Sequence, residues 1–162
     1  HGAKNSALPI LAGTLLCDGE TTLENCPRLT DVFAACRILT HLGCRCMIQE
    51  HTVTVQVRDL RSDTIPEALM QEMRSSIIFL GAVLGRSGSC HLSYPGGCEL
   101  GARPIDLHLA ALRSMGAAIQ ETGGRWAHMF LYMGDSWIAP HRRDCTAQPY
   151  TCRSLRWERQ KT

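Results

Sequence analysis

One pattern of residues occurs twice in the sequence. Residues 17–23 parallel residues 86–92, and residues 39–44 parallel residues 112–117. In each copy, periodic apolar residues predict a helix, a strand, a second helix and a second strand, and the copies lie about 70 residues apart. A unit repeated at a fixed spacing folds as an array of similar substructures. The repeat therefore predicts an α/β fold built from consecutive copies of one unit.

The second copy is longer than the first in one place. From Gly19 to Gly43 the sequence advances 24 residues, whereas from Gly88 to Gly116 it advances 28. The additional residues lie in or beside residues 96–104, which connect a predicted strand to a predicted helix. When one copy of a repeat keeps the same helices and strands but has a longer connection, that connection is typically a functional loop.

Residues 94–108 contain three glycines around a single cysteine. Glycine lowers both helix and strand propensity, so we expect a loop in the first part of this segment. Cys98 lies on the loop and Arg103 follows five residues later, and a nearby guanidinium favours the thiolate over the thiol. Cys98 is therefore a candidate nucleophile or proton donor. The alternative is a small apolar side chain packed under a glycine turn.

Composition excludes several classes of protein. The 162 residues carry a net charge of +2 with no basic run before the C-terminal end, so we expect no nucleic acid and no membrane as partner. No apolar stretch reaches the roughly 18 residues that a membrane span needs. The nine cysteines fall largely in apolar periodic segments and include no CxxC. We therefore expect buried thiols in a cytoplasmic protein, and no metal site.

The first helix is expected to begin at Ser6 as its N-cap, with Pro9 in its first turn. Lys4 and Asn5 would then lie just before a helix N-terminus, where free backbone N–H groups attract phosphate or carboxylate. A solvated lysine beside the cap is the alternative. Further along we predict strands at 20–25, 44–49, 52–57, 89–94 and 117–121, and helices at 30–42, 66–74, 77–84 and 106–115, the last with Leu109, Leu112 and Met115 inward.

Three motifs of the chain resemble one known family. Residues 2–9, residues 73–76 and residues 95–108 (PGGCELGARPIDLH) are similar in order and spacing to the UDP-N-acetylglucosamine 1-carboxyvinyltransferases, the MurA group of enolpyruvyl transferases. The resemblance covers residue 1 to about residue 124. It implies an inverse α/β barrel of enolpyruvyl transferase type, built from repeated βαβαββ units. The chain resembles about two of the three repeats of one domain, an N-terminal fragment without the family's first strand and C-terminal domain.

The resemblance also implies an activity. The family transfers enolpyruvyl from phosphoenolpyruvate to the 3-hydroxyl of UDP-N-acetylglucosamine and releases phosphate, which is the first committed step of peptidoglycan synthesis. The implied setting is the bacterial cytoplasm, with roles in cell-wall biogenesis, cell shape, the cell cycle and cell division, and with fosfomycin as an inhibitor. The implied partners are the two small-molecule substrates and the missing C-terminal domain of the same enzyme. No metal or organic cofactor is implied.

The same resemblance implies roles for single residues. Cys98 would form a covalent adduct with phosphoenolpyruvate, take part as general acid or in product release, and be alkylated by fosfomycin. Lys4 and Arg103 would hold the phosphate and carboxylate of phosphoenolpyruvate. Asn5 would contact the sugar nucleotide, and Arg74 its diphosphate region. The residues expected to line the uridine are Pro104, Ile105, Asp106 and Leu107. His108 matches the motif but is expected to be a structural histidine.

The family's general-base aspartate and second phosphoenolpyruvate-binding arginine belong to the absent half, so we expect the fragment alone to be inactive. A second interpretation is an inactive remnant, or a partial UDP-sugar-binding module without turnover. A thiol redox protein is disfavoured because Cys98 has no partner at CxxC spacing. A related transferase that acts on shikimate 3-phosphate shares the fold, but the Gly-Gly-Cys loop argues against this second transferase.

The segment 125–162 departs from the family pattern. It holds all three tryptophans and a crowd of arginines near the C-terminal end, without a sustained apolar period. We therefore divide the chain into a partial enolpyruvyl transferase domain at 1–124 and a non-matching tail at 125–162. A translated frame shift, an artificial junction or disorder would explain the tail, and a divergent third repeat is the alternative.

Overall fold

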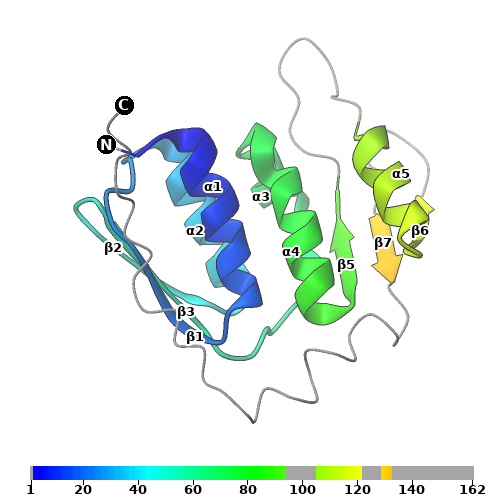
Figure 1. Ribbon diagram of the computed structural model, residues 1–162, viewed down its shortest axis with the longest axis horizontal. Coiled ribbons are helices and arrows are strands. Elements are labelled where there is room, and N and C mark those ends of the chain that lie inside the picture. The colour runs from blue at the N-terminus through cyan, green and yellow to red at the C-terminus, as the bar shows by residue number, and fades with distance from the viewer. Residues whose placement is uncertain (1, 94–104, 122–128, 133–162) are drawn as a thin grey trace, which may run out of the picture.

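The computed structural model describes residues 2–93, 105–121 and 129–132. The first part of the chain forms α1 (Lys4–Gly13), η1 (Thr14–Leu16), β1 (Gly19–Leu23), α2 (Thr30–His41), β2 (Arg45–Gln49) and β3 (Thr52–Val57). The second part forms β4 (Thr64–Ile65), α3 (Glu67–Gln71), η2 (Arg74–Ile77), α4 (Ile78–Ser87), β5 (Ser89–Leu92), α5 (Asp106–Ser114), β6 (Ala118–Glu121) and β7 (Met129–Tyr132). Helices and strands alternate as the repeat predicts, and Figure 1 shows them in order along the chain.

The two sheets confirm the repeat. The first sheet has the antiparallel strand order β1-β3-β2, and the second has the order β4-β5-β7-β6, in which only β4 is parallel to its neighbour. Without β4, the second sheet has the topology of the first. Tyr132 faces both Ser89 and Ala118, just as Gln56 faces both Glu20 and Arg45. The two copies therefore share strand order and register.

Two glycines recur where each repeat turns from its second helix into its second strand. Gly43 has φ of 109° and Gly116 has φ of 93°, which are left-handed conformations that other residues rarely adopt. Both act as the helix-ending residue that the sequence predicts. The turn after α2 also donates a hydrogen bond from Cys44 N–H to the carbonyl of Leu39, and Ala117 N–H does the same to Leu112 after α5.

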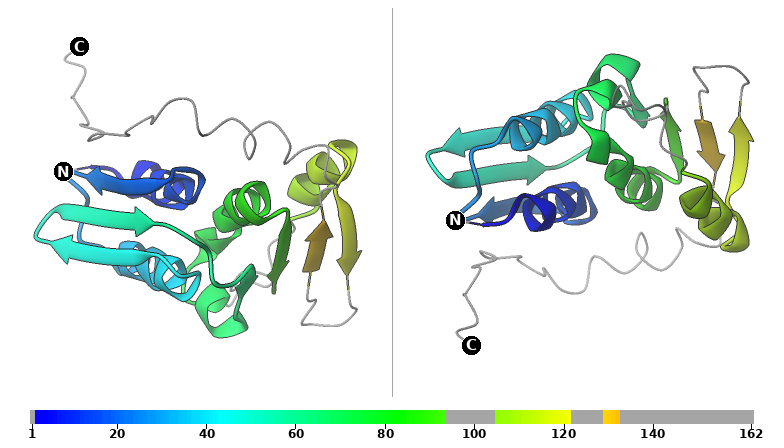
Figure 2. Two further views of the ribbon diagram at one scale, coloured as in Figure 1. Left: turned by 90° about the horizontal axis from the view of Figure 1, so that it is seen from below. Right: turned by 90° about the horizontal axis from the view of Figure 1, so that it is seen from above.

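The helices pack against the sheets and enclose one hydrophobic core. In β3, Val53, Val55 and Val57 are buried while the residues between them are half-buried, which confirms the predicted alternation. The core draws on both repeats and includes the fully buried side chains of Leu11, Leu15, Ile38, Leu39, Leu42, Phe79, Leu80 and Leu92. Figure 2 shows α1 beside α4 and α2 beside α3, so the copies share one apolar interior.

Four details of the predicted elements are wrong. Helix α1 begins at Lys4, not after Ser6, because the carbonyl of Ala3 already accepts from the N–H groups of Ser6 and Ala7. No side chain caps this helix, and Pro9 lies inside it. The predicted helix 66–74 ends at Gln71, so Arg74 begins η2. Met115 is 42% exposed, because α5 ends at Ser114 and the turn at Gly116 carries it off the apolar face, whereas Leu109 and Leu112 do face the core.

Strand β7 lies inside the segment expected to be a non-matching tail. It pairs with both β5 and β6 in the register that β3 has with β1 and β2. The rest of the segment, at residues 125–128 and 133–162, lies outside the described residues. The division of the chain at residue 124 therefore stays a prediction.

Candidate active site

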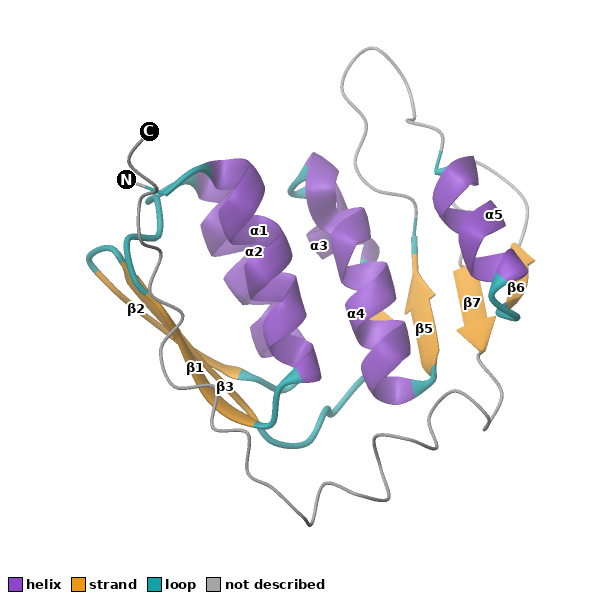
Figure 3. Ribbon diagram, viewed as in Figure 1, coloured by secondary structure: helices purple, strands orange, loops and turns teal. Residues whose placement is uncertain are grey.

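The helices begin at a common edge of the molecule. Figure 3 shows α1, α4 and α5 starting along the upper side and ending along the lower side. Helix α1 begins at Lys4, α5 begins at Asp106, and η2, which begins at Arg74, leads directly into the start of α4. We call this upper side the helix-start edge. Unbonded backbone N–H groups at the first turn of a helix give such an edge a positive potential, which suits anionic ligands. The predicted site residues that the structure describes all lie at these helix starts.

Lys4 makes an ion pair at the helix-start edge. Its Nζ contacts Oδ2 of Asp31, which lies in the first turn of α2. The Lys4 side chain is 46% exposed, whereas that of Asp31 is 18% exposed. Since a half-exposed ion pair contributes only about 0–1 kcal/mol, Lys4 can exchange this carboxylate for another anion at low cost. Lys4 therefore lies in the first turn of the helix rather than before it, with its ammonium already oriented by an anion.

Asn5 and Arg74 occupy matching positions in the two repeats. Asn5 precedes Gly19 by 14 residues and Arg74 precedes Gly88 by 14 residues. Asn5 lies in the first turn of α1, Arg74 is the first residue of η2, and both side chains are exposed. The structure thus brings two residues from separate motifs to equivalent points of the helix-start edge.

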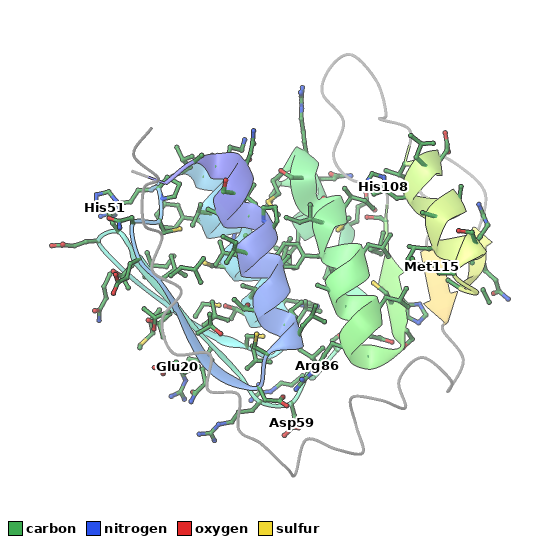
Figure 4. All side chains as sticks on the ribbon, in the orientation of Figure 1. Glu20, His51, Asp59, Arg86, His108 and Met115 are labelled. Atoms are coloured by element: carbon green, nitrogen blue, oxygen red, sulfur yellow. The ribbon has the colours of Figure 1, made fainter. Side chains whose placement is uncertain are left out.

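The predicted uridine-lining residues that the structure describes differ in how exposed their side chains are. Ile105 is 3% exposed and packs in the core, so its side chain is not available to a ligand. Asp106 and Leu107 are exposed in the first turn of α5, and Leu107 is 84% exposed. His108 is also exposed on this turn, and Figure 4 labels its side chain beside α5. The expected structural role of His108 stays a prediction. A ligand at this place would meet the side chains of 106 and 107 and only the backbone of 105.

Cys98, Arg103 and Pro104 lie outside the described residues. The described residues nearest to them are Ser93 and Ile105, each 3% exposed. These two flanking residues are therefore buried, Ser93 directly after β5 and Ile105 directly before α5. The roles expected for the three residues remain predictions.

The described cysteines are all free thiols, and most are unreactive by position. Burial raises the pKa of Cys26, that of Cys44 to about 11 and that of Cys90 to about 12. A buried thiol with a raised pKa stays protonated near neutral pH and is a poor nucleophile. This agrees with the expectation that these cysteines pack as small apolar residues.

Within the described ranges, no group of three or more histidine, cysteine, aspartate or glutamate side chains is arranged to hold a metal ion. The described helices also include none that is long and apolar enough to span a bilayer.

Comparison with known proteins identifies the fold family. The family model described as EPSP synthase (3-phosphoshikimate 1-carboxyvinyltransferase) matches residues 1–129. The chain belongs to this family. The EPSP synthase family fold is also found in the enolpyruvyl transferase NikO from Streptomyces tendae, with a TM-score of 0.70 at 20% identity over 82% of this chain and 28% of that one. An EPSP synthase from Acinetobacter baumannii gives a TM-score of 0.59 at 20% identity over 82% of this chain and 31% of that one.

Curated relatives within the EPSP synthase family are more similar in sequence. UDP-N-acetylglucosamine 1-carboxyvinyltransferase 2 of Caldanaerobacter subterraneus subsp. tengcongensis is 48% identical over 124 residues, which are 76% of this chain and 30% of the relative. UDP-N-acetylglucosamine 1-carboxyvinyltransferase of Cellvibrio japonicus is 45% identical over 124 residues, with the same two shares. The chain therefore spans about 30% of the length of the curated relatives it matches. The expected family resemblance and the partial enolpyruvyl transferase fold are confirmed.

One residue at the helix-start edge has no counterpart among the sequence predictions. Asp31 pairs with Lys4 across 27 positions of sequence, and no motif draws attention to it. The only local signal is an acidic residue in the first turn of a well-predicted helix, which is common because it offsets the helix dipole. The ion pair with Lys4 exists because α1 lies beside α2, and this arrangement cannot be deduced from the neighbouring sequence.

Proposed function

We propose that the chain is part of an enolpyruvyl transferase that moves the enolpyruvyl group of phosphoenolpyruvate onto the 3-hydroxyl of UDP-N-acetylglucosamine. The reaction is the first committed step of peptidoglycan synthesis, in the cytoplasm of a bacterium. The observation that carries the proposal is identity of 42–48% to relatives that all bear the name of this reaction. The helix-start edge supports it, because both substrates are anions and Lys4 and Arg74 are exposed at helix starts on this edge.

Phosphoenolpyruvate needs two kinds of charge neutralisation. In this proposal Lys4 binds its phosphate as a point charge, and Arg103 binds phosphate or carboxylate with a bidentate fork. Lys4 reaches the ligand by leaving Asp31, and the ligand then takes the place of a carboxylate already paired with the ammonium. Asp31 thus keeps Lys4 extended along the edge before substrate arrives, which lowers the entropy cost of binding.

The sugar nucleotide extends along the helix-start edge. Asn5 contacts the sugar, Arg74 pairs with the diphosphate, and the first turn of α5 meets the uridine. The equivalent positions of Asn5 and Arg74 in the two repeats support this assignment, since one extended ligand can contact the same point of successive units. Asp106 and Leu107, both exposed, supply a hydrogen-bond acceptor and an apolar surface at that end.

Cys98 is the reactive thiol in this proposal. As a thiolate it adds to C2 of phosphoenolpyruvate while C3 takes up a proton, so that the C2–C3 double bond is replaced by one C–S and one C–H bond in the covalent adduct. Alternatively, as a thiol it donates a proton, and the charge of Arg103 favours the thiolate. Fosfomycin, an epoxide, alkylates the same sulfur. The raised pKa values of Cys26, Cys44 and Cys90 leave those thiols poorly suited to either reaction.

The proposed activity needs more than this chain. The general base and a second arginine for phosphoenolpyruvate belong to the remaining 70% or so of the relatives' length, and they would have to be supplied by the C-terminal domain of the same enzyme. The chain alone is therefore expected to release no phosphate. The alternative is a remnant, or a partial UDP-sugar-binding module, that supports no turnover in any context.

A chimera distinguishes a segment that supports enolpyruvyl transfer from a remnant or binding module that does not. The 124-residue matching segment of this chain replaces the corresponding segment of the Caldanaerobacter relative, and phosphate release is measured with phosphoenolpyruvate and UDP-N-acetylglucosamine. We expect turnover, with loss of it in a matched Cys98→Ala chimera. A folded chimera without turnover would contradict the proposal and favour the remnant. Turnover with shikimate 3-phosphate in place of the sugar nucleotide would move the function to the other branch of the family.

A further inference from the structure

The Lys4–Asp31 ion pair joins the starts of two helices of the first repeat. Helix α1 packs against α2, and the first turns of the two helices meet at this pair. Nζ of Lys4 contacts Oδ2 of Asp31, while the hydroxyl of Thr30 lies 3.4 Å from Oδ1 of the same carboxylate. The carboxylate also lies in the first turn of α2, where the helix dipole favours a negative charge. An anion of the chain itself therefore contacts the ammonium that the proposed function gives to phosphate.

The second repeat shows that this junction folds without a lysine. Lys4 precedes Gly19 by 15 residues and Met73 precedes Gly88 by 15 residues, so the two side chains occupy equivalent positions. Met73 is 3% exposed and belongs to the hydrophobic core. An apolar side chain thus serves at the position of Lys4. The ion pair of the first repeat adds a property that packing of the repeated unit does not require.

The exposed part of Lys4 opens the ion pair to competition. The Lys4 side chain is 46% exposed, so a dissolved anion can reach it, whereas that of Asp31 is 18% exposed. Because Asp31 belongs to the same chain, its carboxylate acts at a high effective concentration. A ligand that binds only the unpaired form of Lys4 has its apparent affinity reduced by the fraction of Lys4 that is unpaired. The ion pair therefore weakens the binding of any dissolved anion at Lys4.

We propose that Asp31 is a displaceable counter-ion, which competes with phosphate for Lys4 and takes the ammonium back when phosphate leaves. The inference rests on the proposed function, in which Lys4 binds the phosphate of phosphoenolpyruvate and inorganic phosphate is a product. Without this counter-ion, Lys4 would hold the released phosphate more tightly, because each anion would meet an unpaired ammonium. Asp31 thus acts through Lys4 and needs no contact with either substrate.

The full chain allows Lys4 to be observed directly, because the sequence contains only one other lysine, Lys161. The chain is labelled with carbon-13 at lysine, and the NMR signals of the lysine Cε–H groups are followed as inorganic phosphate is added at constant ionic strength. Lys161→Arg leaves a single lysine and so assigns the Lys4 signal. We expect Asp31→Asn to lower the Kd of phosphate at Lys4 by about two- to fivefold, the range that an exposed ion pair supports. Asparagine keeps an acceptor oxygen, so this variant removes the competing charge but not the acceptor.

Two further variants separate competition from the general effect of charge. Asp31→Glu keeps a carboxylate beside Lys4 and should return the Kd to that of the unsubstituted chain. Asp18→Asn makes the same change of charge in the ion pair between Asp18 and Arg86. Arg86 lies in the last turn of α4, and Figure 4 labels it at the lower end of this helix, opposite the helix-start edge. Asp18→Asn should therefore leave the Kd at Lys4 unchanged.

Equal Kd values for the unsubstituted chain and Asp31→Asn would overturn the proposal and leave the phosphate role of Lys4 intact. An equal decrease in Asp18→Asn would also overturn it, since net charge would then explain the effect. If phosphate moves the Lys4 signal in none of the variants, both this proposal and the role of Lys4 in the proposed function are wrong. An inactive chimera combined with the expected Kd values would contradict the proposed function alone.

Discussion

The two repeats of this chain share strand order and register, yet they differ in the connection between the first strand and the second helix. In the first repeat residues 24–29 join β1 to α2, whereas in the second residues 93–105 join β5 to α5. Both connections carry a cysteine, Cys26 in the short one and Cys98 in the long one. Cys26 is buried, and burial raises the pKa of its thiol. The proposed function assigns chemistry to the longer connection, whereas the shorter one contributes its cysteine to packing.

The largest expected effect concerns these two cysteines. When the full chain reacts with fosfomycin, we expect the adduct on Cys98 and none on Cys26, because only a thiolate opens the epoxide at an appreciable rate. Fragmentation of the tryptic peptides locates the adduct, since Cys17 and Cys26 share one peptide and Cys90 and Cys98 share another. Cys98→Ser is the control and should remove the adduct. An even distribution of adduct over the cysteines would show that the longer connection has no special reactivity.

The second prediction compares equivalent core leucines. Leu39 and Leu112 each precede their turn glycine by four residues, but Leu39 is fully buried and Leu112 only partly so. Leu39→Ala should lower the free energy of unfolding by roughly 2–5 kcal/mol, as deletions in a closed core do. Leu112→Ala should cost about 1 kcal/mol, because less apolar area leaves the interior. Urea denaturation of the two variants measures the difference, and equal losses would mean that both helices are equally enclosed.

The third prediction concerns the turn glycines. A Cβ on Gly43 would lie 2.9 Å from both the backbone nitrogen and Cγ of Arg61, whereas a Cβ on Gly116 would meet nothing within 4 Å. Gly116→Ala should therefore cost roughly 1–2 kcal/mol for the left-handed backbone alone. Gly43→Ala should cost about 3 kcal/mol, because Arg61 must also move and strain its hydrogen bond to the carbonyl of Leu42. If Gly116→Ala proves the more damaging, the contact with Arg61 is not what sets the cost.

The smallest effect is expected at the helix starts. Asp31→Asn removes the ion pair with Lys4 and a charge that offsets the dipole of α2, so it should cost about 1 kcal/mol or less. Asp106→Asn is the matched change in the first turn of α5 and should cost about 0.3–1 kcal/mol. Thermal unfolding of both variants is measured at low and at high salt. The loss of stability that is due to charge should become smaller at high salt. If Asp31→Asn lowers the free energy of unfolding by clearly more than about 1 kcal/mol, the ion pair stabilises the fold more than an exposed pair normally does.

Much of the fold was predictable because its signals are local. The alternation of Thr52–Val57 indicates one buried and one wetter face, and the burial of Val53, Val55 and Val57 follows it. The predicted helix 30–42 matches α2 within one residue, since its apolar period and the glycine after it depend only on neighbouring positions. The start of α1 was predicted wrongly because serine is a common N-cap residue, but the N-cap of the helix is Ala3, three residues before Ser6.

The candidate site was predictable in part. Lys4, Asn5, Arg74, Asp106 and Leu107 were named from motifs, and the structure brings them to helix starts along one edge. The burial of Ile105 was not predictable, because an isoleucine between a loop and a helix can face either side. Asp31 was missed for a similar reason, as its role depends on how α1 lies against α2.

The sequence by itself determined the repeated unit, its glycine turns and the longer connection of the second copy, since all three follow from spacing and local backbone preference. The strand order β1-β3-β2 and the Lys4–Asp31 ion pair come from tertiary structure. Each of these joins residues whose separation in sequence says nothing about their separation in space. Only burial of the shared core holds the helices and sheets in the positions that make such contacts.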